Sequence, residues 1–378
     1  MEMSDINPER LIEIRAVNGL TQEELANILG KSKGTISKWE NGNANPDIQS
    51  IAKLADSFKM PIKWFTTSSI ESDNSLYQYR CSPSSTTKVI RDYARIRLKW
   101  LREISSVFEE WVDFPDLNLP VAPSRLAALN LDDLEIEQYA YRLRKLWELG
   151  DRPIEDLTGI VESNGIIVTR EPVGREGMDG VSSWFSNRPY IWLVDNKNNY
   201  YRSRFDIAHE LGHLVLHKNL LCEDCEKNTA RYKEVERQAH LFAAHFLMPR
   251  RAFTSSYRNI TLDNLLIEKK YWGVSVAALI RQYHTLGIIS DEYKLRLHKN
   301  YSYRRWRKNE PFDDITPPEK PRLMANTIEL LLDEGGFEKT EILNKTNYGD
   351  KEVESLCALP KGFFNNQIPT KTSSLKLL

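Results

Sequence analysis

The stretch RSRFDIAHELGHLVLH, residues 202–217, decides the fold of the central part of the chain. Its histidines His209 and His213 are four positions apart, which on a helix places both imidazoles on one face at metal-binding distance. Glu210 follows the first histidine, where a carboxylate can take a proton from a zinc-activated water. Gly212 is expected to leave room beside the metal. The pattern predicts a buried, zinc-binding helix that carries a general base.

A zinc site of this kind needs a third protein ligand. An extended metzincin signature would place a histidine at position 219, where the chain has Asn219. The segment EVERQAHLFAAHFLMP, residues 234–249, has helical periodicity instead, and its Glu236 would complete a set of two histidines and one glutamate. Glu234 and His217 remain rival ligands at this point.

The segment TQEELANILGKSKGTISKWENGNANPD, residues 21–47, predicts two short helices joined by a turn. Thr21 and Glu24 have the spacing of a capping box at the start of the first helix. Gly30 turns the chain into a second helix over residues 33–40, whose outward face carries lysines and small residues. Such a face suits a nucleic-acid groove.

This N-terminal pattern resembles the helix-turn-helix domain of phage-repressor-like (Cro/C1, or XRE) regulators over about 60 residues. The resemblance implies that the second helix enters the major groove of a double-stranded operator. Lys33 and Lys38 would reach base edges, and phosphates would be held by Gln22, Thr35 and Asn41. Such regulators bind paired half-sites as dimers, so a homodimer is expected. Because residues 1–66 hold 8 basic and 9 acidic side chains, a protein-interaction module is the alternative.

The segments 202–217 and 234–249 together resemble the ImmA/IrrE metallopeptidase family, and the likeness extends over roughly residues 130–250. The resemblance implies an α+β zincin-like domain in which zinc is the cofactor and Glu210 is the catalytic base. The zinc ligands that it implies are His209, His213 and Glu236. The position after Ala239, commonly Asn in this family, is His240, which adds a polar group near the metal.

The remaining sequence divides around these motifs. Residues 68–87 are rich in serine and threonine and predict a linker, and residues 88–113 predict a long amphipathic helix that packs on the next domain or on a second subunit. Helices at 132–149 and 154–164 and strands at 165–170, 180–185 and 190–194 are expected before the metal-binding helix. We therefore predict a multidomain chain with four parts: an all-α helix-turn-helix domain at 1–67, a linker and long helix at 68–130, the metallopeptidase domain at 131–287, and a small helical C-terminal domain at 288–378.

Composition limits the compartment and the partners. The 52 lysines and arginines balance 53 acidic residues, so the net charge of -1 gives no global attraction to nucleic acid or to anionic lipid. No apolar stretch approaches the roughly 18 residues of a membrane span, and the N-terminus lacks a signal-peptide pattern. We expect a cytoplasmic protein with reduced cysteines, in which Cys222 and Cys225 are an incidental pair.

These features lead to one main functional hypothesis and two alternatives. The main one is a DNA-binding regulatory zinc metallopeptidase that cleaves a helix-turn-helix repressor or a similar protein, as the family resemblance implies for stress, phage or mobile-element contexts. Residues 68–87 offer an exposed cleavage site within the chain itself. The alternatives are a transcription factor whose peptidase-like domain is a non-cleaving ligand or metal sensor, and an antitoxin-like regulator that holds a second protein. An intact Glu210 favours catalysis.

Overall fold

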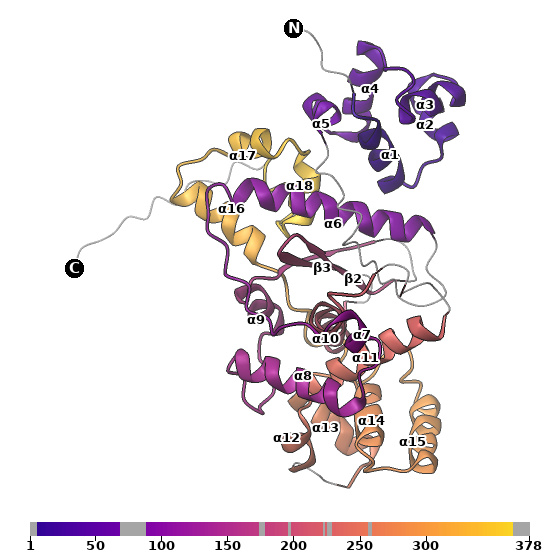
Figure 1. Cartoon of the computed structure of the whole chain (residues 1–378), viewed down its shortest axis with the longest axis vertical. Coiled ribbons are helices and arrows are strands. Elements are labelled where there is room, and N and C mark those ends of the chain that lie inside the picture. Colours follow the sequence, from indigo (N-terminus) through magenta and orange to yellow (C-terminus); the bar gives the residue numbers. More distant parts are fainter. Residues whose placement is uncertain are drawn as a thin grey trace, which may run out of the picture.

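The computed structural model describes residues 6–68, 88–173, 178–195, 198–221, 224, 229–255 and 259–365 (Figure 1). The N-terminal unit consists of short helices around one apolar core, as predicted. Gly30 has the positive φ of 70° that the turn between the second and third helices requires, and Thr21 and Glu24 form the expected capping box. The helices of this unit are α1 Pro8–Val17, α2 Gln22–Leu29, α3 Lys33–Glu40, α4 Ile48–Phe58 and α5 Ile62–Thr66.

A three-stranded sheet separates the two large apolar cores of the molecule. Its strands are β1 Ile167–Glu171, β2 Gly180–Phe185 and β3 Arg188–Val194. β3 lies in the middle, parallel to β1 and antiparallel to β2. Side chains alternate across a strand, so in β3 Tyr190 and Trp192 enter one core whereas Ile191 and Leu193 enter the other.

One face of the sheet is covered by α6, Lys88–Phe108, together with the last three helices of the described chain (Figure 1). These are α16 Leu323–Asp333, α17 Lys339–Thr346 and α18 Asp350–Leu356. α6 ends earlier than the expected 88–113, and its apolar side chains, from Ile90 to Phe108, are buried within the same chain. The suggestion that this helix packs on a second subunit is therefore wrong for its apolar face, which the sheet, α1, α17 and α18 already cover.

The other face of the sheet carries α10, the helix predicted to bind a metal, and the second core. This core is built from α8 Asp133–Leu146, α9 Leu157–Ser163, α10 Tyr200–Leu216, α11 Ala230–Leu247, α12 Arg250–Ser255, α13 Leu262–Trp272, α14 Val276–Thr285 and α15 Asp291–Tyr303, and the short α7, Arg125–Ala128, precedes α8. None of the described helices is both long and apolar enough to cross a membrane.

The predicted fold class is confirmed: a helical N-terminal unit is followed by a small sheet with helices and then by further helices. The four domain limits stay predictions. The helices beyond residue 287 do not share one core, however, because α15 packs with α13 and α14 whereas α16, α17 and α18 join the core of the N-terminal unit and α6.

The N-terminal unit is docked on this body through buried charged groups. The guanidinium of Arg10, which is 2% exposed, donates to the carboxylates of Glu13 and Glu103 at 2.8 Å each. The Tyr348 hydroxyl donates to Glu103 as well. Next to it, a Cβ on Gly349 would lie 2.2 Å from the carbonyl oxygen of Lys59, so only glycine allows this approach of the C-terminal helices to the N-terminal unit.

Candidate metal centre

α10 and α11 pack closely because of a glycine in the middle of α10. A Cβ on Gly212 would lie 3.0 Å from the ring of Phe242 and 3.1 Å from the carbonyl oxygen of Ala239, both on α11. The expectation that Gly212 leaves room beside the metal is therefore wrong; its lack of a side chain admits the second helix. This close approach brings Glu236 of α11 to the histidine face of α10.

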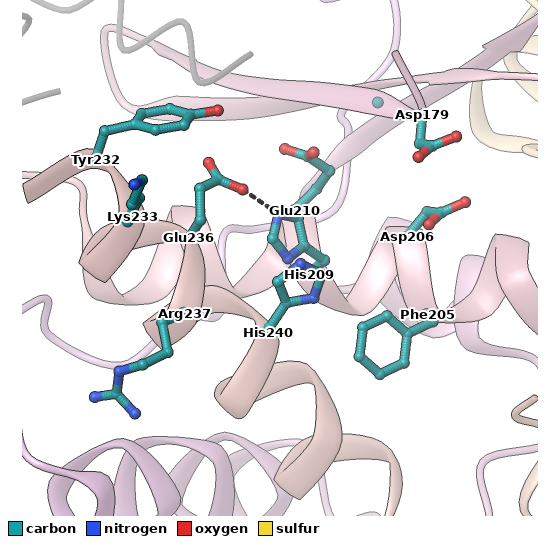
Figure 2. A pocket seen from close by; sticks show the side chains of 11 residues that line it. Asp179, Phe205, Asp206, His209, Glu210, Tyr232, Lys233, Glu236, Arg237 and His240 are labelled. Carbon is teal, nitrogen blue, oxygen red and sulfur yellow. Dashed lines mark ion pairs between the residues drawn. The ribbon is translucent and has the colours of Figure 1, made fainter. Parts of the chain in front are cut away.

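The three predicted ligands converge on one point. Glu236 Oε2 lies 3.3 Å from His209 Nε2, and Glu236 Oε1 lies 3.5 Å from His213 Nε2. The two Nε2 atoms are 3.1 Å apart, and one donor atom from each residue falls within 4.8 Å of the others. Figure 2 shows Glu236 directed at His209. The rival Glu234 is instead held by Arg237, at 2.8 Å.

A buried chain of hydrogen bonds fixes the tautomer of His213, so that the ring nitrogen facing Glu236 carries a lone pair. His217 Nε2 lies 2.7 Å from Gln238 Oε1 and donates to it, which leaves His217 Nδ1 as an acceptor. His213 Nδ1 lies 3.1 Å from that atom and donates to it. In neutral His213 the lone pair is then on Nε2, the form that binds zinc. The rival ligand His217 thus lies behind His213 and outside the site.

The residues present fit zinc by their chemistry. Burial alone raises the pKa of Glu236, but the adjacent imidazoles of His209 and His213 lower it well below its usual value, so this carboxylate is ionised. Within the described ranges, Glu236 Oε1 and His209 Nδ1 are buried without a hydrogen-bond partner. A carboxylate and two imidazole lone pairs aimed at one point repel one another unless a cation lies between them. A site of two histidines and one glutamate is a common catalytic zinc set.

Glu210 lies in the same cavity and is only 4% exposed. Burial raises its pKa to about 7, although the nearby His209 and a hydrogen bond from Ser182 lower it. Ser182 Oγ, on β2, donates to Glu210 Oε2 at 2.7 Å and so fixes the carboxylate. A carboxyl group with a pKa near neutrality can both take and return a proton.

The cavity has a volume of about 440 Å³ and opens between the edge of β2 and the two helices. His240 lies below His209 in Figure 2, with its ring centroid 4.4 Å from that of His209. Burial lowers the pKa of His240 to about 3, so its imidazole is neutral. Side chains that the sequence argument missed also line the cavity: Asp179, Tyr232, Lys233 and Arg237. Tyr232 precedes Glu236 by one helical turn, and that spacing was the available signal.

The predicted DNA contacts lie on or beside α3. Lys33, Lys38 and Asn41 are exposed. The hydroxyl of Thr35 lies 2.9 Å from that of the N-cap Ser32. Gln22 donates to Glu40 at 2.8 Å, an interaction within the N-terminal unit that competes with a phosphate contact. These roles stay predictions, and Cys222, Cys225 and residues 69–87 lie outside the described residues.

Comparisons with known families agree with both motifs. Residues 11–65 match the helix-turn-helix family. Residues 161–283 match peptidase family M78, described as the IrrE N-terminal-like domain. Both resemblances are confirmed, in the predicted order. No curated protein gives a match to the chain.

Proposed function

We propose that this chain, which joins a helix-turn-helix domain to a domain of a metallopeptidase-type family, is a DNA-binding regulatory zinc metallopeptidase. Its protein substrate would be a helix-turn-helix repressor or a similar regulatory protein. The observation that carries the proposal is the meeting of His209, His213 and Glu236 beside a buried Glu210 in one cavity.

The chemistry follows from the roles that these side chains can take. His209, His213 and Glu236 would hold zinc, which when bound polarises the scissile carbonyl and lowers the pKa of water. Glu210 takes a proton from the attacking water and later gives it to the leaving amine. The Ser182 hydroxyl keeps the Glu210 carboxylate oriented during both transfers. Neutral His240 can donate a hydrogen bond to the substrate backbone.

The size of the cavity supports selective cleavage. Its volume of about 440 Å³ is near the lower end of the roughly 300–1,000 Å³ that ligand pockets span. A site this small accepts a short extended segment, so a folded protein is cut only where such a segment is exposed. The linker at residues 68–87 of this chain, or the corresponding region of another repressor, is our proposed target.

DNA binding is the second half of the proposal. The exposed face of α3 offers Lys33 and Lys38 for base edges. Gln22, Thr35 and Asn41 would contact phosphates. A homodimer would place two such helices on paired half-sites of an operator.

The first experiment measures zinc in the purified full chain and in two variants. We expect about one zinc per wild-type chain, loss of zinc in Glu236→Ala, and retention in Glu210→Gln, because Glu210 is a base and not a ligand. A folded wild-type chain that holds no zinc would exclude this mechanism.

The second experiment tests cleavage on the chain itself. Mass spectrometry of the zinc-loaded protein should show fragments cut within residues 68–87, absent in Glu210→Gln. Because Glu210→Gln should keep its zinc, it also tests the sensor alternative, in which regulation survives this substitution. The docking of the N-terminal unit through Arg10 and Gly349 favours that alternative, since a signal in the body would reach the DNA-binding helices. An antitoxin-like role predicts a stable complex with a second protein and no cleavage.

A further inference from the structure

A second cavity, of about 420 Å³, lies at the C-terminal ends of β1 and β3. It is lined by Arg170 of β1, Asp195 after β3, Lys320 before α16, Lys351 and Glu354 of α18, and Lys361 beyond it. It shares no lining residue with the cavity of the metal centre. Three segments far apart in the sequence therefore bring four cationic side chains to one hollow.

The positive charge in this cavity is only partly neutralised by the surrounding side chains. Lys320, Lys351 and Lys361 are exposed, and their ammonium groups have no hydrogen bond or ion pair with the part of the chain that the structure describes. The Glu354 carboxylate already accepts two hydrogen bonds, from the backbone N–H groups of Gly362 and Phe364 at 2.8 and 3.1 Å. Asp195 is the second carboxylate among the lining residues, so four cationic side chains face two anionic ones.

Arg170 adds a fourth positive charge from the floor of the cavity. Its guanidinium donates to the neutral Ser203 hydroxyl on α10. Its Nε is buried without a partner among the described residues. Burial lowers the pKa of Arg170, although Asp195, Asp206 and Glu319 lie near enough to raise it. Because its hydrogen-bond partner is neutral, this half-buried guanidinium attracts an anion in the cavity, although the three nearby carboxylates weaken that attraction.

We propose that this cavity is a binding site for a small organic dianion or polyanion of the phosphate or polycarboxylate class. Its volume lies within the roughly 300–1,000 Å³ of small-molecule pockets. The three ammonium groups offer charge-assisted hydrogen bonds to such an anion. Neither the peptidase chemistry nor the DNA contacts proposed above use these residues, so the site goes beyond the proposed function.

The position of α18 gives such a ligand a route to the DNA-binding unit. Lys351 lies in the first turn of α18, two residues after Gly349, whose α-carbon faces the Lys59 carbonyl of the N-terminal unit. The preceding Tyr348 donates to Glu103, the carboxylate that also holds Arg10. An anion that binds to Lys351 therefore acts on the same short segment that docks the DNA-binding helices, as an allosteric effector would.

Isothermal titration of the full chain with inorganic phosphate and with succinate, at constant ionic strength, tests the proposal. We expect saturable binding of at least one probe. The charge reversal Lys351→Glu/Lys361→Glu should weaken it by about tenfold or more. The matched control Lys299→Glu/Lys308→Glu, which changes two exposed lysines in and beyond α15, should bind as the wild type does.

The outcomes separate the ligand sources. Binding of phosphate alone assigns a phosphate ester, binding of succinate alone assigns a polycarboxylate, and binding of both supports a dianion site that charge governs. No saturable binding of either probe, or equal weakening in both double variants, would overturn the proposal. A repeat in Glu236→Ala should leave binding unchanged, so failure of the metal site and failure of this site are distinguishable. Circular dichroism of each variant checks that it is folded.

Discussion

The Nδ1 atoms of His213 and His217 lie 3.1 Å apart, on the side of His213 that faces away from Glu236. This pairing, extended by Gln238, presents the Nε2 lone pair of His213 to the metal centre. Partners of this kind behind a ligand tune metal affinity without touching the metal. Replacing them therefore separates a positioning role from a ligand role.

Gln238→Leu should weaken zinc binding by about 10–100-fold while one zinc per chain still binds at saturation. Without the Gln238 amide as an acceptor, the proton of His217 is no longer kept on Nε2. His217 Nδ1 then no longer selects the tautomer of His213 that has its lone pair on Nε2. Competition with a chromophoric chelator measures the affinity. Arg231→Gln, at an exposed position of the same helix, should leave it unchanged. Unaltered affinity in Gln238→Leu would show that the chain of hydrogen bonds is only structural.

Ser182→Ala should shift the acidic limb of zinc-dependent cleavage to higher pH. The Ser182 hydroxyl stabilises the ionised form of Glu210, so its loss raises the pKa of Glu210 further and reduces the fraction of base at neutral pH. Activity should recover as the pH rises, and the zinc content should not change. A uniform loss of activity at every pH would point to distortion of the site instead.

Arg10→Met should lower the free energy of unfolding by about 3–5 kcal/mol, because it leaves two buried carboxylates, Glu13 and Glu103, without their shared cation. Chemical denaturation followed by tryptophan fluorescence reports the change, since Trp64 and Trp100 lie in this contact region. Arg296→Met, at an exposed position of α15, is the control and should change stability by less than about 0.5 kcal/mol. Equal effects of the two substitutions would contradict the docking role of Arg10.

Glu162→Gln should remove a pH dependence of stability. Burial raises the pKa of Glu162 from 4.5 to about 7, although backbone N–H groups of Arg322 and Leu323 lower it. The folded state therefore binds the proton more tightly than the unfolded state, and stability falls as the pH rises from about 4.5 to about 7. The fall amounts to about 3 kcal/mol at most. Denaturation curves across this range should be flatter for Glu162→Gln, and an unchanged slope would assign the dependence to other groups.

The features that the sequence predicted rest on local spacing. The distance of four residues between His209 and His213 and the capping box at Thr21 are set within one or two helical turns. Periodicity also placed the strands within about three residues of their observed ends. Glu236 was found because the second motif has its own helical pattern.

The features that it missed depend on packing between distant segments. Ser182 meets Glu210 because β2 lies beside α10, and no spacing in the sequence indicates that pair. Gly212 was read as space for a metal because its true neighbour, Phe242, belongs to another helix. The burial of α6 was likewise invisible, since an amphipathic helix does not reveal which surface will cover it.

Because the first and last helices share one core, that core cannot be completed until the end of the chain has been synthesised. Leu101 of α6 and Tyr348 belong to the same apolar cluster, yet almost 250 residues separate them in the chain. At synthesis rates of about 5–20 residues per second, roughly 12–50 s pass between their emergence from the ribosome. During that interval the parts of α6 and of the N-terminal unit that the last helices cover remain exposed. A nascent chain of this protein should therefore expose that apolar surface until its final helices arrive.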